Sequence, residues 1–218
     1  MFEDLNYAIN IDKLGALQPI LNCAAADEPE VRAAAVWALG SALQDLKEVK
    51  DVFMQRDGHE VLAKCLLDLN AKVRAKAVMA SSALLRNSSK EIRERFAELG
   101  GTISLRRLLA DDNILVRRRA RFFMQHARAT GNEEFVRDLL DDRNAIAAFS
   151  ESIAALDVDD VADMEAGIGA LQVLVEIDKQ GLLRVAPELP GVIDQVVARC
   201  GDPDLAESLT SLADSLGG

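Results

Sequence analysis

Apolar and polar positions recur along the chain with helical spacing. In the stretch that follows Asp27-Glu28-Pro29-Glu30, the apolar residues fall three or four positions apart, at Val31, Ala35, Ala38, Leu39 and Ala42. Such residues share one face of an α-helix. The four residues before them are typical of a helix start, with an acidic cap and a proline in the first turn.

The same pattern predicts helices along the rest of the chain. The expected helices span residues 47–56, 58–69, 71–86, 90–99, 101–110, 114–129, 133–140, 145–156, 164–177, 192–200 and 204–216. Ala and Leu supply much of the apolar share, and aromatic residues make up only 4% of the chain. Such a composition suits close-packed helices better than a sheet.

The helical pattern repeats about every 43 residues. Gly15, Gly58 and Gly101 each open an apolar segment. About fifteen residues after each glycine follows a second pattern: Val31-Arg32-Ala33-Ala34-Ala35, Val73-Arg74-Ala75-Lys76-Ala77 and Val116-Arg117-Arg118-Arg119-Ala120. A fixed period in this range marks a helical solenoid, because each unit buries its apolar stripe against its neighbours.

Three helices per repeat favour an all-α fold, a right-handed armadillo-repeat α-solenoid of about four repeats with a degenerate C-terminal cap. We expect a single domain over residues 1–218, with repeats at approximately 13–57, 58–100, 101–143 and 144–190 and a cap at 191–218. Gly58 is expected to adopt the left-handed turn between helices. Solenoids usually work through an extended surface that holds a partner, so the fold favours binding over catalysis.

Charge is distributed unevenly. The chain carries a net charge of −11, and residues 1–128 hold 20 Lys and Arg against 17 Asp and Glu, whereas residues 129–218 hold 5 against 19. An acidic chain repels phosphate backbones, so we expect no nucleic-acid partner. No apolar run approaches a spanning helix, and the N-terminus lacks a secretory signal. With three scattered cysteines, a cytoplasmic monomer away from membranes is expected.

Residues that could carry catalysis or bind a metal are sparse. The two histidines, His59 and His126, stand in different repeats, and there is no Cys-x-x-Cys spacing. The pair Gly167-Ile168-Gly169 lacks the rest of a phosphate-binding loop. We therefore expect no enzyme activity, no metal and no cofactor.

A candidate binding surface follows from aligning the long helices by repeat. Ala34, Lys76 and Arg119 share one position, and three residues later come Trp37, Met79 and Phe122. This row lies beside the packed stripe and would form the floor of a groove on the concave face. Its apolar band would be flanked by Lys76, Arg86 and Arg119. Ordinary packing between repeats is the alternative for the three large apolar residues.

Arg119 differs in its expected role from the other arginines of its run. Arg117, Arg118 and Arg121 are expected on a solvated face, paired with neighbouring carboxylates. Arg119 lies in the groove row, where its guanidinium could hold a carboxylate through two bonds.

The first two repeats resemble those of a known family. Val73-Arg74-Ala75-Lys76-Ala77 with Leu84-Leu85-Arg86-Asn87, and Leu39-Gly40-Ser41-Ala42-Leu43-Gln44-Asp45, are similar to repeats of the armadillo-type nucleotide exchange factors of heat-shock-protein-70 (Hsp70) chaperones. Glu3-Asp4-Leu5-Asn6-Tyr7-Ala8-Ile9-Asn10 resembles their entry motif. The resemblance covers about residues 3–125.

The resemblance implies a co-chaperone without enzyme activity. Family members hold one lobe of the chaperone ATPase domain on the concave face and speed ADP release. Carried over by position, Ala8 would sit at the contact edge and Arg119 would be a polar anchor. Trp37, Lys76, Met79, Arg86 and Phe122 are added from the groove geometry alone.

Two other functions fit parts of the pattern. A generic armadillo scaffold would bind an extended peptide or another protein. Peptide carriers need a regular Trp and Asn ladder, whereas Trp37 is not repeated and the ladder position reads Ser41, Ala83 and His126. Helical-repeat bilin lyases share part of the Val-Arg pattern, but their repeats are about thirty residues long.

Overall fold

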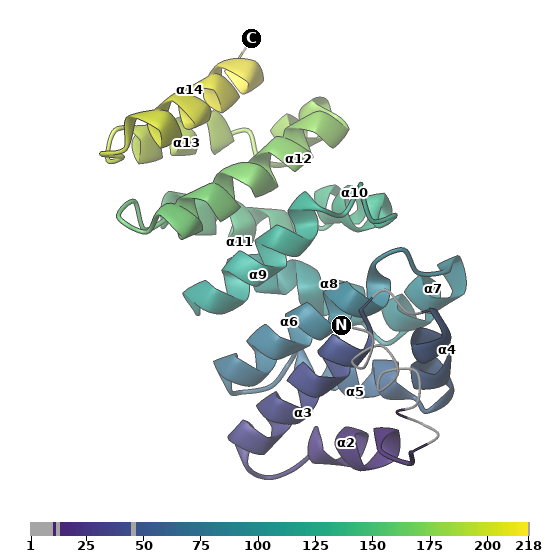
Figure 1. Cartoon of the computed structure of the whole chain (residues 1–218). Coiled ribbons are helices and arrows are strands. Elements are labelled where there is room, and N and C mark those ends of the chain that lie inside the picture. Colours follow the sequence, from purple (N-terminus) through teal and green to yellow (C-terminus); the bar gives the residue numbers. More distant parts are fainter. Residues whose placement is uncertain (1–10, 12–13, 45–46, 218) are drawn as a thin grey trace. The chain divides into compact units, whose positions relative to one another are not determined.

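The computed structural model describes residues 11, 14–44 and 47–217, and every regular element among them is a helix (Figure 1). Contacts divide the chain into two compact units, Met1–Leu105 and Arg106–Gly218. We describe each unit by itself. The expectation of a single domain over residues 1–218 stays a prediction.

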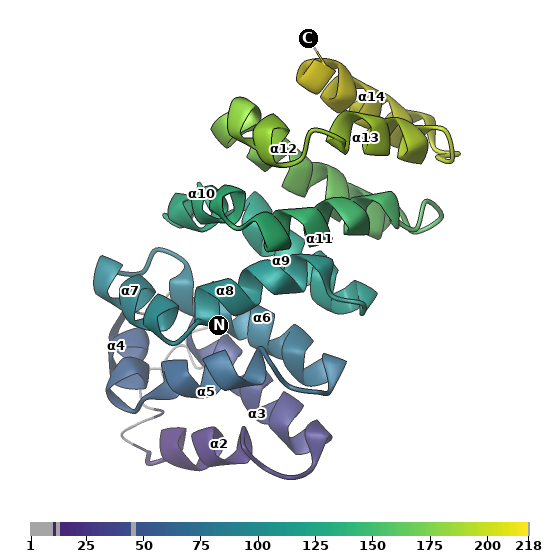
Figure 2. The ribbon, with the colours of Figure 1, turned by 180° about the vertical axis from the view of Figure 1, so that it is seen from behind.

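The first unit is built from short and long helices. Its elements are α2 (Leu17–Cys23), α3 (Pro29–Ala42), α4 (Lys47–Gln55), α5 (Gly58–Cys65), α6 (Ala71–Leu85), α7 (Lys90–Glu98) and the start of α8 (Gly101–Arg107). The long helices α3 and α6 lie side by side in both views and form its most extensive pairing (Figures 1 and 2). Leu39, Val73 and Leu84 are buried in its core.

Small residues let α3 and α6 approach closely. A Cβ at Gly40 would lie 3.0 Å from the Ala80 Cα and 3.1 Å from the Ala80 Cβ. Such contacts are tighter than ordinary van der Waals packing, so a larger residue at position 40 would force the helices apart.

Gly58 has a different structural role from the predicted one. The left-handed residue of this turn is Asp57, with φ of 55°, and Gly58 itself opens α5. A Cβ at Gly58 would collide with the ring of Phe53, and one at Gly101 with the ring of Phe96. The repeated glycine thus makes room for a buried phenylalanine on the short helix before it.

Helix starts follow the sequence signals in part. Helix α3 begins at Pro29 as expected, but Glu28 at the cap position makes no side-chain cap bond, so the acidic cap was wrongly predicted. In α6 the Asn70 side chain accepts a hydrogen bond from the Lys72 backbone N–H, which satisfies a donor that has no partner within the helix.

The second unit continues from the end of α8. Its elements are η1 (Leu108–Ala110), α9 (Ile114–Gln125), α10 (Glu133–Asp141), α11 (Arg143–Ala154), α12 (Val161–Val185), α13 (Leu189–Val197) and α14 (Pro203–Gly217). Helix α9 packs along α12, and α13 and α14 pack on each other, with α13 also on α11 and α14 also on α12 (Figure 2). Phe149, Leu171 and Ile193 lie in this core.

Helix α12 is kinked. Asp178 has non-helical φ and ψ angles of −158° and 81°, and its side chain accepts a hydrogen bond from the Gly181 backbone N–H at 2.8 Å. Asp178 therefore caps the short second segment of the helix. The helix runs through Gly167 and Gly169 and extends further at both ends than the predicted 164–177.

Candidate partner-binding surface and the charge network beside it

Trp37 and Lys76 meet on the surface of the first unit. Trp37 on α3 is 55% exposed, and the Lys76 ammonium on α6 lies 5.1 Å from the centroid of its ring. A cation over an indole face at this distance is attracted by the ring quadrupole. The stack forms because α3 and α6 pack closely, which brings together two residues from successive repeats.

The other predicted residues of this unit lie further along α6. Met79, one turn after Lys76, is 38% exposed. Arg86 is the exposed C-cap residue of α6, and its extended backbone turns the chain toward α7. Arg86 lines a pocket with Lys47 and Lys50, so it has neighbours that the predicted row did not include.

Arg119 and Phe122 lie on α9 of the second unit. Phe122 is 55% exposed and its ring centroid lies 4.3 Å from that of His126, whose Nδ1 is 2.9 Å from the Phe122 carbonyl oxygen. Arg119 is half-buried, and burial lowers the pKa of its guanidinium below the usual value. Phe122 and His126 are four residues apart, a spacing that places both side chains on the same face of the helix.

The row beside the packed stripe is thus solvent-facing within each unit. Trp37, Met79 and Phe122 are all exposed, which argues against the alternative that they fill the space between repeats. Ala8 lies outside the described residues. The exposure of these side chains shows which face of each helix is turned to solvent. That they bind a partner stays a prediction.

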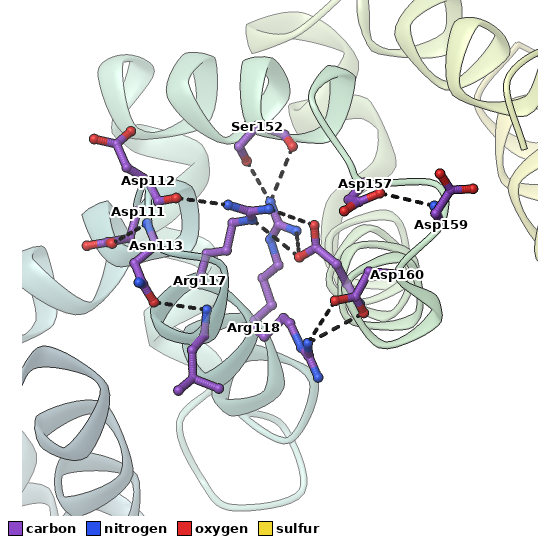
Figure 3. A network of polar contacts seen from close by, with 12 residues as sticks. Asp111, Asp112, Asn113, Arg117, Arg118, Ser152, Asp157, Asp159 and Asp160 are labelled. Carbon is purple, nitrogen blue, oxygen red and sulfur yellow. Dashed lines mark hydrogen bonds and ion pairs between the residues drawn. The ribbon is translucent and has the colours of Figure 1, made fainter. Parts of the chain in front are cut away.

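A buried charge network ties together three helices of the second unit (Figure 3). The side chains of Arg121 and Asp163 are both completely buried. Asp163 accepts hydrogen bonds from Arg117 Nη2 at 2.8 Å and Nε at 3.3 Å, and from Arg121 Nη1 at 3.4 Å. Arg121 also donates to Ser152 Oγ on α11 at 2.8 Å and to the Leu109 carbonyl at 3.2 Å.

The network corrects one expectation about the arginine run. Arg117 and Arg118 pair with carboxylates, as expected, and Figure 3 shows both reaching toward the start of α12. The expected solvated face is wrong for Arg121, whose side chain is completely buried, and for Arg117, whose side chain is 15% exposed. The pKa of Arg121 is lowered to about 10, chiefly by burial; the nearby Asp163 carboxylate acts in the opposite direction, and the positive charge of Arg117 adds to the lowering. Among the described residues, no carboxylate partner of Arg119 is found.

The arginine of the repeated Val-Arg pattern is structural. Arg32 donates to Asp68 through Nε at 2.7 Å and Nη2 at 3.0 Å, and through Nη1 to the carbonyls of Ala26 and Asp27. Arg74 and Arg117 likewise bind carbonyls of the loop before their own helix. The motif thus holds each loop against the long helix that follows it.

No cluster of three or more metal-binding side chains occurs in the part of the chain that the structure describes. Within that part, none of the helices combines the length and apolarity that crossing a membrane requires. The exposed row residues of the first unit and those of the second unit present aromatic, thioether and cationic groups. These groups suit contact with another macromolecule.

Curated relatives share this sequence pattern. The chain is 32% identical over 128 residues to the Hsp70 nucleotide exchange factor FES1 of Mycosarcoma maydis, a match that covers 57% of this chain and 32% of the relative. It is 34% identical over 116 residues to the Hsp70 nucleotide exchange factor FES1 of Saccharomyces cerevisiae, covering 51% and 40%. The resemblance is confirmed. The chain spans about a third to two fifths of the length of these relatives.

Solved structures share the fold. A designed armadillo repeat protein in complex with the peptide (KR)4 superposes with a TM-score of 0.69 at 18% identity, covering 97% of this chain and 86% of that one. The armadillo repeats only protein of Plasmodium falciparum gives 0.66 at 15% identity, covering 98% and 97%. The predicted all-α armadillo-repeat fold is confirmed. No family model matches the sequence.

Proposed function

We propose that this chain is a co-chaperone that binds the ATPase domain of an Hsp70 chaperone and accelerates release of ADP. The observation that carries the proposal is the similarity to Hsp70 nucleotide exchange factors, at 32% and 34% identity over more than half of the chain. In this proposal the chain is a cytoplasmic monomer without enzyme activity of its own, and neither nucleic acid nor a membrane takes part.

The exposed row supports binding through the faces of α3, α6 and α9. Trp37 and Phe122 are each more than half exposed, and large aromatic side chains are the usual anchors of protein interfaces. Lys76 and Arg119 add positive charge beside them. We propose that these residues, with Ala8, Met79 and Arg86, contact the chaperone lobe on the concave face.

The mechanism requires only differential binding. A partner shifts a conformational equilibrium by the difference in its affinity for the two states. If the chain binds the opened nucleotide-free lobe more tightly than the closed lobe, it weakens ADP binding. By linkage, ADP weakens the binding of this chain by the same factor. No catalytic group is needed.

Stopped-flow release of a fluorescent ADP analogue tests the proposal. An Hsp70 ATPase domain is loaded with the analogue and mixed with excess unlabelled ATP, with and without this chain. The chain should increase the release rate in a saturable manner. An unchanged rate at saturating concentration of a correctly folded chain would refute the proposed function.

Matched variants test the surface. Trp37→Ala and Phe122→Ala should each raise the half-saturating concentration by about tenfold, as expected for loss of an interface anchor. Leu67→Ala removes another exposed side chain, 64% exposed on a loop outside the row, and should leave it unchanged. If the chain instead binds an extended peptide as a generic armadillo scaffold, the release rate will not respond to it.

A further inference from the structure

The first unit supplies its own cation to an exposed aromatic ring. The Lys76 ammonium on α6 lies 5.1 Å from the centroid of the Trp37 ring on α3. A positive charge over a ring face is favourable because the ring quadrupole attracts it. Helices α9 and α12 of the second unit also pack along each other, so their neighbouring residues can be compared with those of α3 and α6.

The second unit has an exposed ring but lacks the cation. Phe122 on α9 occupies the repeat position of Trp37 and is likewise 55% exposed. Helix α12 contains neither Lys nor Arg from residue 161 to residue 178. Among the described residues, Phe122 belongs to none of the cation–ring pairs, and its ring packs against His126 with a centroid distance of 4.3 Å. This aromatic pair can therefore receive a cation from outside the chain.

Two contacts between α9 and α12 show which part of α12 passes Phe122. Arg118, one turn before Phe122, donates to a carboxylate oxygen of Asp160 at 3.2 Å (Figure 3). Gln125, three residues after Phe122, donates through Nε2 to the Ala166 carbonyl oxygen at 3.2 Å. Because Phe122 lies between these two contacts on α9, residues 160–166 at the start of α12 lie alongside it.

This stretch of α12 presents a carboxylate to solvent. Glu165 is exposed, and within the described part of the chain it forms no ion pair. Arg119, three residues before Phe122, is half-buried and supplies a positive charge on α9. One anion and one cation thus accompany the aromatic pair. Residues 129–218 hold 19 Asp and Glu against 5 Lys and Arg, so the wider charge of this part of the chain favours a positive group.

We propose that Phe122, His126 and Glu165 bind an arginine or lysine side chain of the chaperone lobe. The cation would lie over the aromatic pair, as Lys76 lies over its ring in the first unit, and its N–H groups would donate to the Glu165 carboxylate. Glu165 offsets the repulsion from Arg119. The assignment rests on the proposed function, since the chaperone supplies the side chain, and it adds His126 and Glu165 to the contact surface.

A basic peptide tests the site without the chaperone. Acetylated tetra-arginine amide is titrated into the full chain at low ionic strength, and NMR follows the ring signals of its two histidines, which carry a ¹³C label. The His126 signals should shift saturably, whereas those of His59, buried in the first unit, should not. Glu165→Gln should weaken the binding about fivefold. Glu151→Gln, which neutralises an exposed carboxylate on α11, should leave it unchanged.

The ADP-release assay tests whether the chaperone uses the site. Glu165→Gln should raise the half-saturating concentration about fivefold, Glu165→Lys should raise it further, and Glu151→Gln should not change it. If Glu165→Gln matches the unmodified chain in peptide binding or in half-saturating concentration, the proposal is refuted. If the peptide binds in a Glu165-dependent manner but the unmodified chain does not accelerate ADP release, the proposed function fails and the site for a basic side chain stands.

Discussion

Asp163→Asn is the substitution that the second unit should tolerate least among its charged residues. The change keeps the shape of the side chain but removes its charge. It leaves Arg121, whose side chain is completely buried, and Arg117, whose side chain is 15% exposed, without the carboxylate between them. The change also replaces one of the two acceptor oxygens of the carboxylate by an NH2 group, which can only donate and therefore cannot bind the N–H groups of the arginines.

The expected loss follows from the burial of the groups. Removing one partner of a buried ion pair costs about 3–5 kcal/mol, because the remaining charge stays buried without compensation. Asp163 serves two arginines, so the upper part of that range is expected. Glu133→Gln is the control. It breaks the Glu133–Arg137 pair of α10, in which both side chains are well exposed, and should cost less than about 0.5 kcal/mol.

Urea denaturation measures both variants. Trp37 is the chain's one tryptophan and belongs to the first unit, so its fluorescence follows that unit, whereas circular dichroism follows the helices of both. Asp163→Asn should lower the midpoint seen by circular dichroism. A loss below about 1 kcal/mol would refute the view that the network stabilises the second unit through charge.

Three further substitutions test the first unit by urea denaturation, and a fourth, in the second unit, serves as a control. Burial lowers the pKa of His59, so the imidazole binds a proton more tightly in the unfolded chain, and the free energy of unfolding should fall as the pH drops below about 6.5. His59→Leu should flatten this pH dependence. An unchanged dependence of stability on pH would show that His59 is not its source. Gly40→Ala should cost about 1–3 kcal/mol because its Cβ meets Ala80, whereas Gly191→Ala, with nothing within 4 Å, should be neutral or stabilising. Leu39→Ala, at 1% exposure, should cost about 2–5 kcal/mol, and a cost under about 1 kcal/mol would mean that the core adjusts freely.

Much of the fold could be predicted because the repeat supplies several independent copies of one signal. Each helix start and each glycine has a counterpart about one repeat away, and α6 and α7 end within one residue of the predicted positions. Helix α12 was harder to predict. Its extension beyond residue 177 depends on a kink at Asp178, and no apolar periodicity signals a side chain that caps its own helix.

The candidate surface could be predicted only as far as side-chain exposure. Helical phase places Trp37 and Met79 on a solvent-exposed face, because the phase depends only on neighbours three and four residues away. The burial of Arg121 depends on Asp163, 42 residues later, which a local pattern does not contain. The pairing of Trp37 with Lys76 likewise arises from contact between helices in different repeats.

The hydrogen-bonded ion pair between Arg32 and Asp68 affects whether the chain can gain or lose a whole repeat without losing the pair. Its two ends lie in successive 43-residue modules, and Asp111 stands one module after Asp68. Excision of residues 58–100 would therefore bring Asp111 to the sequence place that Asp68 leaves, and duplication would supply a second acidic residue at the same offset. Gain or loss of a whole module keeps an acidic residue in sequence register with the Arg32 guanidinium, whereas a partial deletion would leave the guanidinium without an acceptor at that place.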